Sequence, residues 1–156
     1  MATSLPSLAY ATRSGVQAQK ERIVALMVGV LLAIAVGLMA RVTGLDRDRA
    51  FYPTVTMVVA SYYVLFAALG ATTSILVLEC AVGAVFVAAA VAGFRSSLWV
   101  AVLGLAGHGI FDLARGSLIP NSGVPAWWPA FCSAYDVTAA AFLAWLLTSD
   151  RVRANA

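Results

Sequence analysis

Hydrophobic residues dominate this chain in five long runs, separated by short stretches that are polar or turn-forming. The runs cover residues 23–40, 53–72, 75–94, 98–119 and 126–148. A membrane-spanning helix needs about 20 apolar residues, within a range of about 17 to 25, and each run meets this requirement. The pattern therefore predicts an all-α fold, a polytopic integral membrane bundle of five transmembrane helices.

The stretches between the runs contain residues that end helices. The first run is followed by "RVTGLDRDRAFYP", the second by "TTS", the third by "RSS" and the fourth by "PNSGVP". Links this short favour antiparallel packing of successive helices in one domain. We expect a polar N-terminal segment (1–22) without the apolar core of a signal peptide, a five-helix transmembrane domain (23–149) and a short C-terminal tail (150–156).

Composition supports a membrane location. Hydrophobic residues make up 62% of the chain and charged residues only 11%, which is far from the composition of soluble domains. The formal net charge of +3 needs no nucleic-acid partner, because most basic residues flank the hydrophobic runs, where membrane orientation accounts for them. We expect a multi-pass protein of the cell membrane that contacts membrane lipid.

Basic residues are distributed unequally between the two ends of the predicted helices. One end carries six of them, at Arg41, Arg47, Arg49, Arg95, Arg151 and Arg153. The other end carries Arg13, Lys20, Arg22 and, by its place near the end of the fourth run, Arg115. The excess of Lys and Arg on cytoplasmic loops predicts that the N-terminus lies outside and the C-terminus in the cytoplasm.

Three of the seven acidic residues fall inside the hydrophobic runs, and so does the only histidine; these four residues are Glu79, His108, Asp112 and Asp136. Each charge at mid-membrane costs roughly 2.5–3.5 kcal/mol on insertion scales, so we expect all four to face the interior of the bundle. The first run has no such residue, which predicts a peripheral helix.

Helical spacing groups these residues into stripes. His108, Asp112 and Arg115 share one face of the fourth run, and Trp128, Cys132, Tyr135 and Asp136 share one face of the fifth. Counting residues from the shared turns places Glu79 level with Asp112, and His108 level with Asp136. The second run adds Tyr62 and Tyr63 near mid-membrane, and glycines 83, 104, 107 and 109 favour close helix approach.

This arrangement suggests acid–base chemistry in one pocket. Arg115 is expected to keep Asp112 ionised, while desolvation favours the protonated form of Glu79 or Asp136. A pocket that holds one acid and one base can catalyse proton transfer, with His108 as the relay. The structural alternative is a buried network in which Asp112 pairs with Arg115 and a second carboxylate fixes the helices together.

No cofactor is predicted, but two other uses of the polar residues stay open. His108 and Asp112, with Glu79 or Cys132 from neighbouring helices, have the side-chain types that ligate a metal ion. A single histidine is more often a hydrogen-bonded core residue. Cys80 and Cys132 lie near the outer ends of their runs, where a disulfide is an alternative to two buried apolar thiols.

We therefore predict a small membrane-embedded enzyme with Glu79, His108, Asp112 and Asp136 as catalytic residues. A lipophilic molecule related to isoprenoids, sterols or quinones is the expected substrate, and isomerisation, cyclisation or hydration the expected step. Its binding site would be lined by Tyr62, Tyr63, Arg115, Trp128, Cys132 and Tyr135. The alternatives are a proton- or cation-coupled transporter, for which five spans would require a homo-oligomer such as a dimer, and an accessory membrane subunit.

Overall fold

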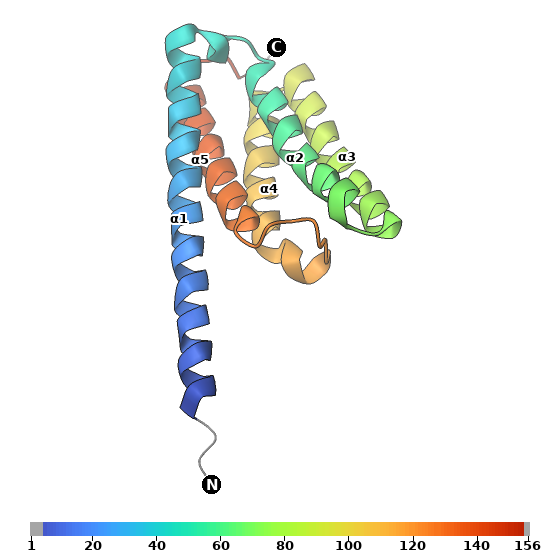
Figure 1. The fold of residues 1–156 in the computed structure, drawn as a ribbon. Helices are drawn as coiled ribbons and strands as arrows, with labels where there is room; N and C mark the ends of the chain where they lie inside the picture. The colour runs from blue at the N-terminus through green and yellow to red at the C-terminus, as the bar shows by residue number, and fades with distance from the viewer. Residues whose placement is uncertain (1–4, 155–156) are drawn as a thin grey trace.

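The computed structural model describes residues 5–154, including the side chains from residue 15 onward. Five α-helices follow one another: α1 (Leu5–Thr43), α2 (Phe51–Gly70), α3 (Thr73–Arg95), α4 (Leu98–Leu118) and α5 (Trp128–Thr148), with a short 3₁₀-helix η1 (Leu45–Arg47) after α1 (Figure 1). Each α-helix is long and apolar enough to cross a membrane, and residues 5–154 contain no strand. The all-α fold with five candidate spans is thus confirmed.

Local signals explain where these helices begin and end. Gly44 ends α1 with a φ of 81°, in the left-handed region that glycine adopts without strain. The side chain of Ser97 accepts a hydrogen bond from the backbone N–H of Trp99 and so caps the start of α4. Pro129 lies in the first turn of α5, where its missing N–H is not needed. Apart from the start of α1, the predicted spans begin and end within a few residues of the observed helices.

Helix α1 differs from the prediction, because it extends about five turns before residue 23. The added stretch contains Ala, Gln, Lys, Glu and Arg, which have high helix propensity. At 1.5 Å per residue its 39 residues span about 58 Å, whereas a whole bilayer with its headgroups is about 40–45 Å thick. Figure 1 shows α1 reaching far beyond the ends of the other helices.

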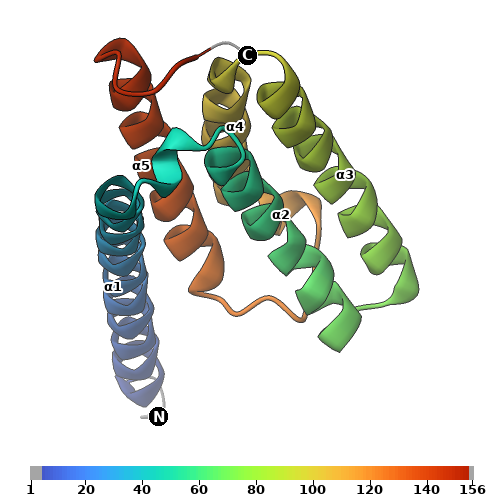
Figure 2. The ribbon, with the colours of Figure 1, turned by 90° about the horizontal axis from the view of Figure 1, so that it is seen from above.

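The helices are not packed equally tightly. Helix α4 is central and contacts α2, α3 and α5, whereas within residues 5–154 the backbone of α1 comes close to α5 and η1 but not to α2, α3 or α4 (Figure 2). The prediction of a peripheral first helix is confirmed. The α1–α5 contact is close at Gly29, where a Cβ atom would collide with the carbonyl oxygen of Phe131 and approach Ala134 Cβ to 3.0 Å.

Arg49 ties together the end of the bundle that carries the C-terminus. Its guanidinium donates to the carbonyl oxygen of Ala154 at 2.9 Å, and to those of Phe94 and Ser96 at 3.2 Å each. Carbonyl groups at the end of a helix lack partners within the helix, and a cation there satisfies them. The α1–α2 link, the end of α3 and the C-terminal tail therefore meet at one end of the molecule.

Candidate functional site

The ionisable residues of the spans lie inside the bundle. Exposed fractions are 2% for Glu79, 1% for His108 and Asp112, and 0% for Asp136. This arrangement confirms that the costly side chains avoid lipid. They do not form a single site, however, but two separate groups at different depths of the bundle.

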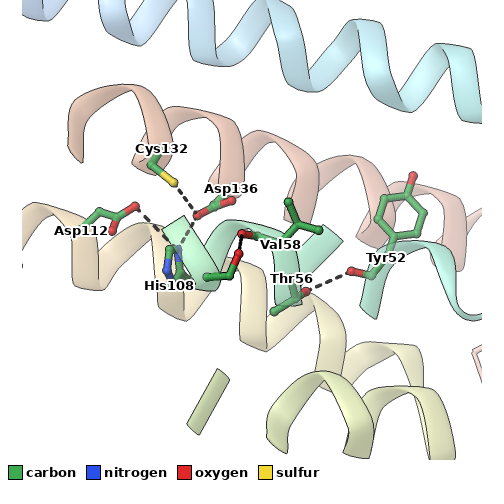
Figure 3. A network of polar contacts seen from close by, with 8 residues as sticks. Tyr52, Thr56, Val58, His108, Asp112, Cys132 and Asp136 are labelled. Atoms are coloured by element: carbon green, nitrogen blue, oxygen red, sulfur yellow. Dashed lines mark hydrogen bonds and ion pairs between the residues drawn. The ribbon is translucent and has the colours of Figure 1, made fainter. Parts of the chain in front are cut away.

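The first group, which we call the four-residue cluster, comprises His108 and Asp112 from α4 and Cys132 and Asp136 from α5 (Figure 3). The Nδ1 atom of His108 lies 2.6 Å from Oδ2 of Asp136 and 3.7 Å from Oδ2 of Asp112. The thiol of Cys132 donates to the same Oδ2 of Asp136 at 3.6 Å. The matched depth that the sequence predicts for His108 and Asp136 is confirmed.

Helix spacing and one glycine position this cluster. His108 and Asp112 are four residues apart on α4, and so are Cys132 and Asp136 on α5, so each pair shares one helix face. A Cβ atom at Gly109 would lie 3.0 Å from the carbonyl oxygen of Ser133 and 3.2 Å from Asp136 Cβ. Glycine therefore allows the two faces to meet, as predicted for this position. At Gly107 nothing lies within 4 Å, so that glycine has no such role.

The second group is an ion pair between Arg115 of α4 and Glu79 of α3. The guanidinium also lies over the ring of Tyr63, 3.6 Å from its centroid. The side-chain amide of Asn121 donates to Glu79 at 2.9 Å and to the carbonyl oxygen of Tyr63 at 3.2 Å. This group joins α2, α3, α4 and the α4–α5 loop near one end of the bundle.

Two expectations from the sequence are wrong in detail. Asp112 does not pair with Arg115, because the described ion pairs join Arg115 to Glu79 and Asp112 to His108. Glu79 does not belong to the four-residue cluster, so it cannot act there as the partner of Asp136. Counting residues from a turn gives the height of a residue but not its direction around the helix, and Arg115 lies nearly one turn closer than Asp112 to the C-terminal end of α4.

An elongated groove runs along the outside of the bundle between α1, α2 and α5. Its volume is about 990 Å³, and most of its lining is apolar. Gln17, Lys20 and Glu21 line one end, and Asp48 lines the other. The groove exists because the backbone of α1 runs close to that of α5 but not to that of α2. Small-molecule binding pockets in proteins usually have volumes of about 300–1,000 Å³, so the groove is large enough to hold a small molecule.

The predicted lining residues separate between the groove and the interior. Tyr62, Trp128, Cys132 and Tyr135 line the groove, where the ring centroids of Tyr62 and Trp128 are 5.0 Å apart. Tyr63 is buried beside Arg115, with its ring centroid 5.8 Å from that of His108. Among these residues, Cys132 alone belongs both to the groove wall and to the four-residue cluster.

The alternative of a disulfide is excluded, because Cys80 is an exposed free cysteine and Cys132 a buried one.

The sequence analysis does not identify Asn121 as a site residue and assigns it only to a turn. Asparagine is common in turns, so its presence in "PNSGVP" does not by itself indicate a buried hydrogen-bond donor.

The cluster has the chemical capacity to hold a metal ion. Each of its four residues offers one ligand atom, and these atoms all lie within 4.8 Å of one another. The set differs from the predicted combination of His108, Asp112 and Glu79, because Cys132 and Asp136 take the place of Glu79.

Comparison with known proteins adds no constraint on function. No family model, no curated protein and no solved structure matches this chain.

Proposed function

We propose that this protein is a membrane-embedded enzyme that acts on a lipophilic molecule held in the groove, with the four-residue cluster as its acid–base centre. The observation that carries the proposal is the position of Cys132, which forms part of the groove wall and donates to Asp136 at 3.6 Å. A group of the bound molecule that displaces this thiol would face the carboxylate directly.

The shape and lining of the groove favour an isoprenoid-, sterol- or quinone-like substrate. The groove is elongated and open along its side, so a molecule dissolved in the bilayer enters without crossing water. Tyr62, Trp128 and Tyr135 present aromatic surfaces next to Cys132. Aromatic faces stabilise developing positive charge, which fits a cyclisation or isomerisation through a cationic intermediate.

The cluster contains the components that proton transfer needs. His108 and Asp136 share a hydrogen bond of 2.6 Å, so a proton can pass between imidazole and carboxylate without a large movement. A second carboxylate, Asp112, lies 3.7 Å from the same nitrogen. Two carboxylates beside one imidazole supply an acid and a base in one pocket.

We further propose that the C-terminal end of the bundle is cytoplasmic and that the protein lies in the cell membrane. Arg115 is neutralised by Glu79 inside the bundle, which leaves Arg13, Lys20 and Arg22 as the basic residues of the opposite end. Six basic residues at the C-terminal end then outnumber three. A reporter active only in the cytoplasm, fused after Ala156, should be active; activity only in an N-terminal fusion would reverse the topology.

The function is tested by identifying the lipids that co-purify with the chain from native membranes. Val58 lines the groove, so Val58→Trp should fill it and remove the enriched lipophilic molecule. Val85→Trp is the matched control, because Val85 is 65% exposed and lies outside the groove. Mass spectrometry should find the same enriched molecule in wild type and in Val85→Trp.

Conversion is tested by the isosteric variant Asp136→Asn. This variant should retain the bound molecule but shift its composition from product toward substrate, because the amide cannot accept the proton. Equal lipid content in Val58→Trp and wild type would show that the groove is not the binding site. An unchanged substrate-to-product ratio in Asp136→Asn would show that the cluster does not act on the molecule.

A further inference from the structure

The four-residue cluster combines one imidazole, one thiol and two carboxylates from two adjacent helices. We infer that this cluster is a binding site for a transition-metal ion, with Zn²⁺ as the ion that its ligands suit best. The ligands would be His108 Nδ1, Cys132 Sγ and one oxygen each of Asp112 and Asp136. This inference deepens the proposed function, on which it rests only for the role given to the ion.

The distances within the cluster are close to those of a tetrahedral zinc site. Ligand atoms around zinc lie roughly 3.3–3.6 Å apart, because Zn–N and Zn–O bonds are about 2.0–2.1 Å and Zn–S bonds about 2.3 Å. His108 Nδ1 lies 3.7 Å from Asp112 Oδ2, and Cys132 Sγ lies 3.6 Å from Asp136 Oδ2. The contact of 2.6 Å between His108 and Asp136 must lengthen by about 1 Å or less, and the other pairs of ligand atoms all lie within 4.8 Å of one another.

Polar atoms without partners provide a second, independent observation. Neither carboxylate oxygen of Asp112 has a partner that meets hydrogen-bond geometry, although the phenol of Tyr63 and the thiol of Cys132 lie nearby, and Oδ1 of Asp136 also has none. Both side chains are fully buried. Buried carboxylates are normally paired or coordinate a metal, because an unpaired one loses its hydration without compensation. A single imidazole nitrogen cannot satisfy both, whereas one cation between them can.

The charge of the cluster also favours a divalent cation. The nearest guanidinium, Arg115, is already engaged by Glu79. With the thiol deprotonated and the imidazole neutral, the four side chains carry a formal charge of −3, which Zn²⁺ reduces to −1. Magnesium and calcium prefer oxygen ligands, so a thiolate and an imidazole select against them.

Metal binding would change the protonation of the cluster in a defined way. The thiol of Cys132 releases its proton to solvent, and the imidazole carries its remaining proton on Nε2. Within the proposed enzyme, a bound ion would replace the proton shared by His108 and Asp136 and would supply Lewis acidity, and the carboxylate oxygens of Asp112 and Asp136 that do not ligate it would serve as bases. Movement of Cys132 away from the ion would open a coordination position toward the groove.

The experiment uses the full chain in detergent micelles, stripped with a chelator and then equilibrated separately with Zn²⁺, Co²⁺ or Mg²⁺. We expect one Zn²⁺ per chain by elemental analysis and no retained Mg²⁺. Co²⁺ should give the visible bands of a tetrahedral site and a thiolate-to-cobalt charge-transfer band in the near ultraviolet. The cobalt spectrum thus identifies the type of atom that ligates the ion, and elemental analysis gives the number of ions per chain.

Two cysteine variants separate this site from adventitious binding. Cys132→Ser should abolish the charge-transfer band and weaken Zn²⁺ binding at least 10-fold, whereas Cys80→Ser removes the exposed cysteine and should change neither. Asp112→Asn, which keeps the shape of the side chain, should also weaken binding, and circular dichroism checks that each variant is helical.

Three outcomes would overturn the inference: no stoichiometric metal in the stripped and reloaded wild type, equal binding by Cys132→Ser, or loss of the band in Cys80→Ser. The lipid analysis described above does not depend on these results. A chain that binds no metal but loses its lipid in Val58→Trp would overturn the metal site alone. A chain that binds zinc but no lipophilic molecule would overturn the proposed function alone.

Discussion

Replacing Arg115 with methionine is expected to lower the free energy of unfolding by about 3–5 kcal/mol, because it leaves the carboxylate of Glu79 buried without its partner. Glu79 is only 2% exposed, so water cannot replace the guanidinium. Asn121 would remain as a hydrogen-bond donor at 2.9 Å, but a neutral amide does not compensate the charge. Unfolding of the purified protein in mixed micelles, followed by circular dichroism, measures this loss.

The double variant Glu79→Gln, Arg115→Met tests the reason for the loss. It removes both charges, so most of the stability should return, because a buried ion pair contributes little beyond what neutral residues of similar size provide. Arg95→Met, at the exposed end of α3, is the matched control and should change stability by less than about 0.5 kcal/mol. A single variant Arg115→Met as stable as Arg95→Met would contradict the burial of this pair.

Gly29→Ala is expected to loosen the contact between α1 and α5 at a cost of about 1–3 kcal/mol, because the added methyl group would collide with backbone rather than with a flexible side chain. Helix α1 must then move away from Phe131, which lines the groove. Since α1 forms one wall of the groove, its displacement should also reduce retention of the bound lipophilic molecule.

Gly15→Ala is the matched control on the same helix. Nothing lies within 4 Å of a Cβ atom at Gly15, so this change should be neutral or stabilise α1 by up to about 1 kcal/mol through helix propensity. Thermal unfolding and lipid retention are measured for both variants. If Gly29→Ala matched Gly15→Ala in both measurements, the close α1–α5 approach would be absent in the membrane.

The sequence was sufficient to predict the five helices, because the length of an apolar run is set directly by the thickness of the bilayer. It was also sufficient to predict that His108 and Asp136 lie at the same depth, and in the structure they contact each other. Both residues lie on polar stripes at the same depth, and no other histidine competes. These predictions were possible because a charged side chain is costly in the membrane and because polar residues recur at the spacing of one helix face.

Other features of the site depended on rotation and tilt, which residue counting does not contain. The guanidinium of Arg115 reaches α3 rather than Asp112 on its own helix, so the pairing follows from the angle between α3 and α4. The groove depends on the distance between the backbones of α1 and α2, which do not run close together although the two helices are consecutive. Neither relation follows from helix length or from the spacing of polar residues.

The isolated position of α1 has a consequence for biosynthesis. Helix α1 is synthesised before α5, the α-helix against which its backbone packs most closely. Until α5 is inserted, α1 waits in the lipid as an unassociated span, exposing glycines and small residues to any neighbouring helix. A ribosome stalled before residue 128 would therefore leave α1 without α5, the helix that it packs against.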